Sequence, residues 1–230
     1  MQKKELIPLA IIAVMFLVGF SVLPHLPDEV PSHFAEYGVA NAFTSGVQAA
    51  FLIPILSLIA YFFFILVPKT LIHKKSTLQF YMHHIVGIET AFFLFMFVIY
   101  LALLGLVMGH IFDIALVIAP AFSVFLYYYG YLLKFAVPGF PVAIRTPWSI
   151  RNYEVWKSTQ LMGSLTFRIT AVITFFAFLV PNYFFIIFLG PIFANVMFLL
   201  IYSRSLYQDL PKERPRRTQK KTAKKRKSRK

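Results

Sequence analysis

The chain contains no cysteine, so disulfide bonds, thiol nucleophiles and cysteine-ligated metals are excluded. Acidic residues are scarce as well: 9 Asp and Glu stand against 23 Lys and Arg, for a formal net charge of +14. Neither a glycine-rich phosphate-binding loop nor a nucleophile motif is present. These absences predict that the protein is not an enzyme and carries no cofactor.

Hydrophobic residues, in contrast, are abundant. They make up 59% of the 230 residues, and phenylalanine alone occurs 27 times. The mean hydropathy is +0.71. A soluble domain of this length cannot bury so much apolar surface, which indicates a polytopic helical membrane protein. Six apolar runs predict membrane-spanning helices at residues 6–23, 47–67, 85–108, 111–133, 161–180 and 183–202.

The distribution of Lys and Arg predicts the orientation of these helices. Basic residues precede the first span, follow the sixth, and lie between spans two and three and between four and five. The other three connections contain none, and basic loops stay on the cytoplasmic side. We therefore predict an all-α membrane protein, a six-helix bundle in the plasma membrane with both termini cytoplasmic.

Composition divides the chain into three parts. Residues 1–68 form a two-helix unit with an outer loop, residues 69–205 a four-helix unit, and residues 206–230 a disordered basic cytoplasmic tail. The tail is expected to attract anionic lipid headgroups, and RNA offers equivalent chemistry. Pro54 lies within the second span and Pro68 at its exit. Neighbouring helices must satisfy the backbone carbonyls that these prolines free.

The polar segment 142–163 carries the most varied chemistry and both tryptophans, Trp148 and Trp156. Pro147 favours an extended Thr146, and Asn152 is a suitable N-cap for a helix that continues into the fifth span. We predict a platform at the membrane edge with both indoles at headgroup level. The alternative is that its Trp and Arg residues are only membrane anchors and topology signals.

The outer loop, residues 24–46, has three carboxylates and no Lys or Arg. With His25 and His33, its carboxylates could form a divalent-cation site; the alternatives are a solvated loop and a receptor for an external ligand. His83, His84 and Glu89 have poor spacing for metal ligands on one helix, so contact of the histidines with headgroups is preferred. No metal site is predicted.

Two motifs resemble a known family. The segments R-T-P-W-S and E-V-W-K-x-T-x-x-x-G resemble the signature of the SdpI-like membrane proteins, which are immunity and signalling proteins for a secreted sporulation-delaying toxin. The matching positions are Arg145, Thr146, Pro147, Trp148, Glu154, Trp156, Thr159 and Gly163. Ala143 stands where the family usually has Gly, and Gln160 where it usually has His.

The outer loop also resembles a small domain of unknown function that often precedes SdpI-like sequences. The run L-P-D-E-V-P-S-H-F-x-x-x-G supplies Pro27, Asp28, Pro31, His33, Phe34 and Gly38. The resemblance implies protection against, or sensing of, an external peptide toxin. The outer loop would meet the toxin, and the platform would act on a cytoplasmic regulator.

Two charges within the spans favour an alternative function. Glu89 and Arg168 lie at depths of about 6 and 10 Å from the cytoplasmic side at 1.5 Å per residue. We predict that they pair, which would place the third and fifth helices side by side. Snorkelling of Arg168 to the headgroups is the alternative. Such charges, with prolines in spans two and four, suit a secondary transporter, whereas an intramembrane enzyme has the least support.

Overall fold

The structure is a computed structural model that describes residues 6–34, 40–72, 75–110 and 112–210. Within these residues, six helices are long and apolar enough to cross a membrane. They are α1 (Leu6–Val22), α2 (Gly46–Leu71), α3 (Lys75–Val107), α4 (Ala115–Leu133), α5 (Tyr153–Phe175) and α6 (Phe184–Asp209). The six predicted spans and the helical membrane class are confirmed.

Helices α3, α5 and α6 extend beyond the spans predicted for them. Helix α3 begins at Lys75 rather than Ile85, and α5 begins at Tyr153, so the second half of the predicted platform is helical. Helix α6 continues to Asp209, past the predicted start of the tail at 206. The rest of that tail, residues 211–230, lies outside the described residues.

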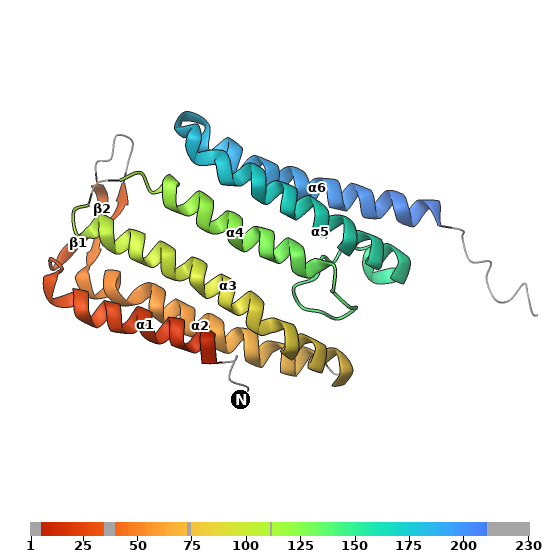
Figure 1. Ribbon diagram of the computed structural model, residues 1–230, viewed down its shortest axis with the longest axis horizontal. Helices are drawn as coiled ribbons and strands as arrows, with labels where there is room; N and C mark the ends of the chain where they lie inside the picture. Colours follow the sequence, from red (N-terminus) through yellow and green to blue (C-terminus); the bar gives the residue numbers. More distant parts are fainter. Residues whose placement is uncertain (1–5, 35–39, 73–74, 111, 211–230) are drawn as a thin grey trace, which may run out of the picture.

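The helices pack in two groups joined by α4 (Figure 1). Helices α1, α2 and α3 contact one another, whereas α5 packs between α4 and α6. Helix α4 contacts both α3 and α5 and lies between them. This order matters for the intramembrane charges, because α4 packs between α3 and α5.

The connections gather at the two ends of the bundle (Figure 1). The start of α1, the α2–α3 connection, the α4–α5 loop and the end of α6 lie at one end. The outer loop lies at the opposite end and forms an antiparallel hairpin of β1 (Glu29–Phe34) and β2 (Ala40–Ser45). The hairpin was not anticipated from the sequence.

The hairpin leads directly into α2. Val30 is buried and pairs with Thr44, while Pro31 pairs with Phe43, whose side chain is exposed. The Ser45 hydroxyl accepts a hydrogen bond from the backbone N–H of Gln48 at 3.2 Å and so caps α2. Strand pairing and this cap hold the hairpin on the helix.

The prolines of α2 explain how α2 and α3 are joined. Proline has no N–H, so Pro54 frees the carbonyl of Ala50 and Pro68 frees that of Phe64, four residues earlier in each case. The hydroxyl of Tyr100 donates to Ala50 O at 2.8 Å, and that of Tyr81 donates to Phe64 O at 2.8 Å. Burial and, second, the charge of Glu89 raise the pKa of Tyr81, which keeps its hydroxyl a donor. The expectation that neighbours satisfy these carbonyls is confirmed.

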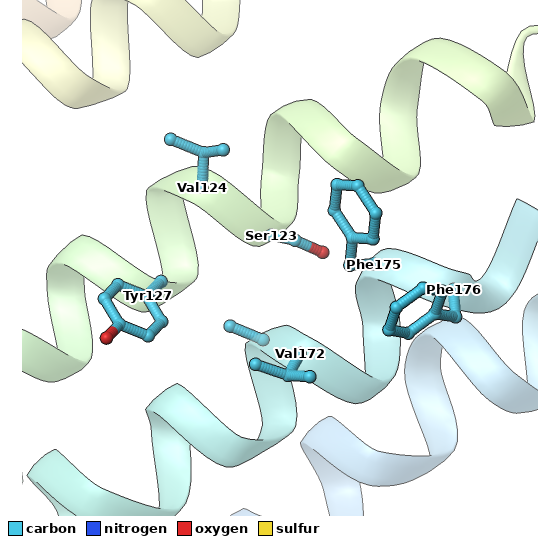
Figure 2. A pocket seen from close by; sticks show the side chains of 7 residues that line it. Ser123, Val124, Tyr127, Val172, Phe175 and Phe176 are labelled. Atoms are coloured by element: carbon cyan, nitrogen blue, oxygen red, sulfur yellow. The ribbon is translucent and has the colours of Figure 1, made fainter.

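Helices α4 and α5 leave a hollow of about 300 Å³ on their outer face (Figure 2). Figure 2 shows Val124 and Tyr127 of α4 on one side, and Val172, Phe175 and Phe176 on the other. Beside it the hydroxyls of Ser123 and Thr174 are buried and 3.0 Å apart. Both walls belong to apolar spans, so the hollow suits lipid hydrocarbon.

Candidate functional site

The platform, residues Val142–Gly163, begins as an extended loop after α4 and ends inside α5. Its first half is folded by a reciprocal pair of hydrogen bonds. The N–H of Thr146 donates to Ser149 Oγ at 2.9 Å, and the N–H of Ser149 donates to Thr146 Oγ1 at 3.0 Å. Both side chains are buried. The short helix η4 (Ser149–Arg151) follows, so the R-T-P-W-S motif is a capped turn.

Asn152 begins α5 as predicted. Its Oδ1 accepts from the N–H groups of Glu154 at 2.8 Å and Val155 at 3.2 Å. Glu154 is exposed in the first turn, where a carboxylate interacts favourably with the positive end of the helix. The predicted N-cap is therefore confirmed, and the helix carries the platform into the membrane span.

Gln160 holds the loop against α5. Its Oε1 accepts from the N–H of Ile144 at 3.0 Å, and its Nε2 donates to the carbonyl of Ile144 at 2.7 Å. Gln160 is only 2% exposed. A carboxamide offers a donor and an acceptor side by side and can satisfy both backbone polar groups of one residue. We call this pair of bonds the Gln160 clamp.

Gly163 permits the same close approach one turn further along α5. A Cβ at this position would collide with Cδ1 of Ile144 and lie 3.3 Å from Cδ1 of Leu133. The absence of a side chain lets Ile144 pack against α5. The motif glycine therefore has a packing role, and the buried Thr159 lies on the same face of the helix.

Trp156 is buried within the bundle. It is 4% exposed and packs with Tyr81, Ile85 and Leu132 in a core shared by α3, α4 and α5. Its Nε1 donates to the backbone carbonyl of Ala136 at 3.2 Å. Its indole fills the space beneath the loop and packs against the bundle, whereas its level in the membrane stays a prediction. Buried indoles usually find such a partner for the N–H.

Trp148 and Arg145 occupy more open positions. Trp148 is half-buried, and the guanidinium of Arg204 on α6 lies 6.0 Å from its ring. The exposed Arg145 donates from Nη2 to the carbonyl of Phe140 at 3.2 Å and to that of Gly139 at 3.5 Å. Gly139 has a φ of +90°, which an L side chain rarely adopts. The platform thus contacts α4, α5 and α6.

The predicted ion pair between Glu89 and Arg168 is wrong. Helix α4 lies between their helices. Arg168 Nε donates to the backbone carbonyl of Ser164 at 2.9 Å, and its backbone N–H lies against Gly130 of α4. Glu89 is 3% exposed within α3. Equal depth in the membrane does not make two helices neighbours, which is where the prediction failed.

The outer-loop residues are only partly described. Pro27 and Asp28 are exposed, and the Asp28 carbonyl accepts from the N–H of Gly46 at 3.1 Å. Glu36 and Gly38 lie outside the described residues, as do the side chains of four more candidates: His33, Phe34, His83 and His84. Among the side chains that are described, no three His, Asp or Glu residues could hold a metal together.

The fold and the platform define a six-helix integral membrane protein with a loop folded onto the bundle. Residues 141–203 match the model of the SdpI/YfhL protein family, and residues 10–58 match a domain of unknown function, DUF1648. The chain is 26% identical over 179 residues to the Immunity protein SdpI of Bacillus subtilis (strain 168), covering 76% of this chain and 83% of that protein. No solved structure matches.

These comparisons confirm the resemblance to SdpI-like proteins. They also confirm the prediction of a multi-pass protein of the cell membrane. The whole platform falls within the first matched region, and the outer hairpin falls within the second. The role of Gln160 was not predicted, although the sequence contains a signal for it. Trp156, Thr159, Gln160 and Gly163 follow the i, i+3, i+4, i+7 spacing of one helix face, which predicts burial.

Proposed function

We propose that the chain is an immunity-type membrane protein that protects its cell against an external, membrane-acting peptide. The similarity to the Bacillus subtilis immunity protein supports this, together with the match of both polar segments to the family models. The proposal includes no catalytic step. In it the hairpin end meets the peptide, and the opposite end acts on a cytoplasmic regulator.

The observation that carries the proposal is the Gln160 clamp. Because Gln160 lies on α5 and binds both polar groups of Ile144, a shift of α5 must move the platform. Trp148 extends the connection to α6 through Arg204. A change in helix packing caused by a peptide in the membrane would therefore reach the platform surface.

Survival of toxin-treated cells tests the protective function. Bacteria sensitive to the sporulation-delaying peptide should survive when they express this chain, and Arg145→Ala or Trp148→Ala should abolish survival at an unchanged level of membrane protein. Lys134→Ala, an exposed cation outside the motif, is the matched control and should protect fully. No protection by the wild-type chain contradicts the proposal. Parallel loss of protein and survival would instead favour a simple anchoring role.

The orientation within the membrane is part of the proposal and rests on the basic connections at one end. The chain has no native cysteine, so single cysteines can be labelled without background. A cysteine replacing the exposed Phe43 should react with an impermeant maleimide on intact cells. A cysteine replacing Lys75 should react only after permeabilisation. The reverse pattern would contradict an orientation with cytoplasmic termini.

Secondary transport is the second candidate, and the buried Glu89 on α3 favours it. A carboxyl group within a span often marks a proton or ion pathway. Proteoliposomes under a pH gradient provide the test: proton-coupled flux that Glu89→Gln abolishes would support transport. Equal proton leak with wild-type, variant and protein-free vesicles would remove this candidate.

A further inference from the structure

A groove of about 890 Å³ lies between the end of α2, the loop after α4 and the start of α5. Phe63 and Val67 line it from α2, Pro138 and Pro141 from the loop. Arg145 and Arg151 line the same space. We call it the platform groove. It joins an apolar wall to two cations.

The two arginines are suited to an anionic ligand. Arg145 is oriented by the carbonyls of Gly139 and Phe140 through one nitrogen, Nη2, and its other nitrogens make no hydrogen bond with the described part of the chain. Arg151 is exposed; its backbone N–H donates to the carbonyl of Trp148 at 3.2 Å, but its guanidinium makes no hydrogen bond or ion pair with any described residue. Guanidinium groups match the geometry of phosphate oxygens and can bind them in pairs.

The surroundings add positive rather than negative potential. Asn152 and Tyr153 also line the platform groove and form the start of α5, whose N-terminal end carries a partial positive charge. Among the described residues that line the groove, none is Asp or Glu. The nearest acid along the chain is Glu154, which is exposed in the first turn of α5.

The apolar wall indicates which anion fits. Phe63 is 63% exposed and belongs to the span Gly46–Thr70, so its side chain lies at the depth of lipid hydrocarbon. It precedes the end of α2 at Leu71 by eight residues, about 12 Å along the helix axis. One ligand would thus meet apolar surface inside the membrane and guanidinium groups at its edge. A soluble acidic peptide would not require an apolar surface at membrane depth.

We propose that the platform groove binds an anionic phospholipid, with its phosphate between Arg145 and Arg151 and one acyl chain along Phe63 and Val67. Such a site is distinct from general attraction of the basic tail to anionic headgroups. It is also independent of the immunity function, because it requires only the groove and its charges. A bound lipid would join α2 to the platform across the gap.

Tryptophan fluorescence gives a direct test, because Trp156 lines the platform groove and Trp148 is the only other tryptophan. The full chain carrying Trp148→Phe is purified in a neutral detergent and titrated with phosphatidylglycerol brominated on its acyl chains. We expect saturable quenching of Trp156, and quenching by brominated phosphatidylcholine only at about tenfold higher lipid concentration.

Arg151→Gln is the decisive variant, since the exposed Arg151 guanidinium makes no hydrogen bond or ion pair with a described residue and the backbone bond to Trp148 is kept. It should weaken phosphatidylglycerol quenching about tenfold, whereas Lys134→Gln, which removes an equal charge outside the groove, should change it less than twofold. Arg145→Gln should also weaken quenching, with circular dichroism as the check on folding. Equal quenching by both lipids, or equal effects of Arg151→Gln and Lys134→Gln, would overturn the proposal. The proposal would also be overturned if an acidic peptide, and no anionic phospholipid, relieved the quenching by brominated phosphatidylglycerol.

Discussion

The two polar segments at opposite ends of the bundle are held in different ways. The platform is fixed by side chains from the membrane core, chiefly the Gln160 clamp and the indole of Trp156. The outer hairpin is held by its own strand pairing and by the cap at Ser45. A segment fixed by a span must respond when the span moves, whereas the hairpin depends on its own strand pairing and on the start of α2. Four substitutions test this difference.

Gln160→Leu should have the largest effect. It leaves the partly buried N–H and carbonyl of Ile144 without the side chain that bonds them, which we expect to cost about 3 kcal/mol of unfolding free energy. Thermal unfolding in detergent micelles measures the loss. Gln160→His should cost about half as much, because the two ring nitrogens of an imidazole point apart and cannot bond both the N–H and the carbonyl of one residue. A loss below about 0.5 kcal/mol for the leucine variant would mean that the clamp is not needed.

Gly163→Leu should follow, with a cost of about 2 kcal/mol. The new side chain would displace Ile144 and press against Leu133. Gly190→Leu on α6 is the matched control, because a Cβ there meets no atom within 4 Å. The same unfolding measurement applies to both. If the two leucine variants unfold alike, close packing of the platform on α5 is not supported.

Tyr100→Phe should cost about 1 to 2 kcal/mol, because it removes the donor to the carbonyl that Pro54 frees. The exposed Tyr183 provides the control, Tyr183→Phe, with no expected change. Recovery of stability in the double variant Tyr100→Phe with Pro54→Ala would confirm the reason, because alanine restores the helical N–H. No recovery would count against it.

Thr44→Val in the hairpin should have the smallest effect. The Thr44 hydroxyl hydrogen-bonds the exposed Gln48 side chain, and no core residue depends on it. We expect a change below about 0.5 kcal/mol in the same unfolding measurement. A loss as large as that of Gln160→Leu would remove the distinction between the two ends.

Much of the architecture could be predicted from the sequence, because apolar runs long enough to cross a membrane indicate helices. The cap at Asn152 and the need for partners at Pro54 and Pro68 followed from local chemistry in the same way. The identity of those partners, Tyr100 and Tyr81, did not, since it depends on which helices are neighbours.

The errors have the same origin. Depth and charge suggested that Glu89 meets Arg168, but the packing order places α4 between their helices. The burial of Trp156 against the bundle was not predicted, although its helical spacing with Gln160 and Gly163 indicated a buried face. The Gln160 clamp itself spans 16 residues and joins a side chain to a loop backbone, a contact that no local pattern encodes.

Hydrogen–deuterium exchange resolved at single amides tests the central claim, that the platform is fixed by α5 while the hairpin is not. In the wild-type protein the Ile144 N–H should exchange slowly, and Gln160→Leu should accelerate it about 100-fold while leaving the amides of β2 unchanged. Equal exchange at Ile144 in the wild-type and variant proteins would contradict the claim, because the clamp would then contribute nothing to the order of the platform.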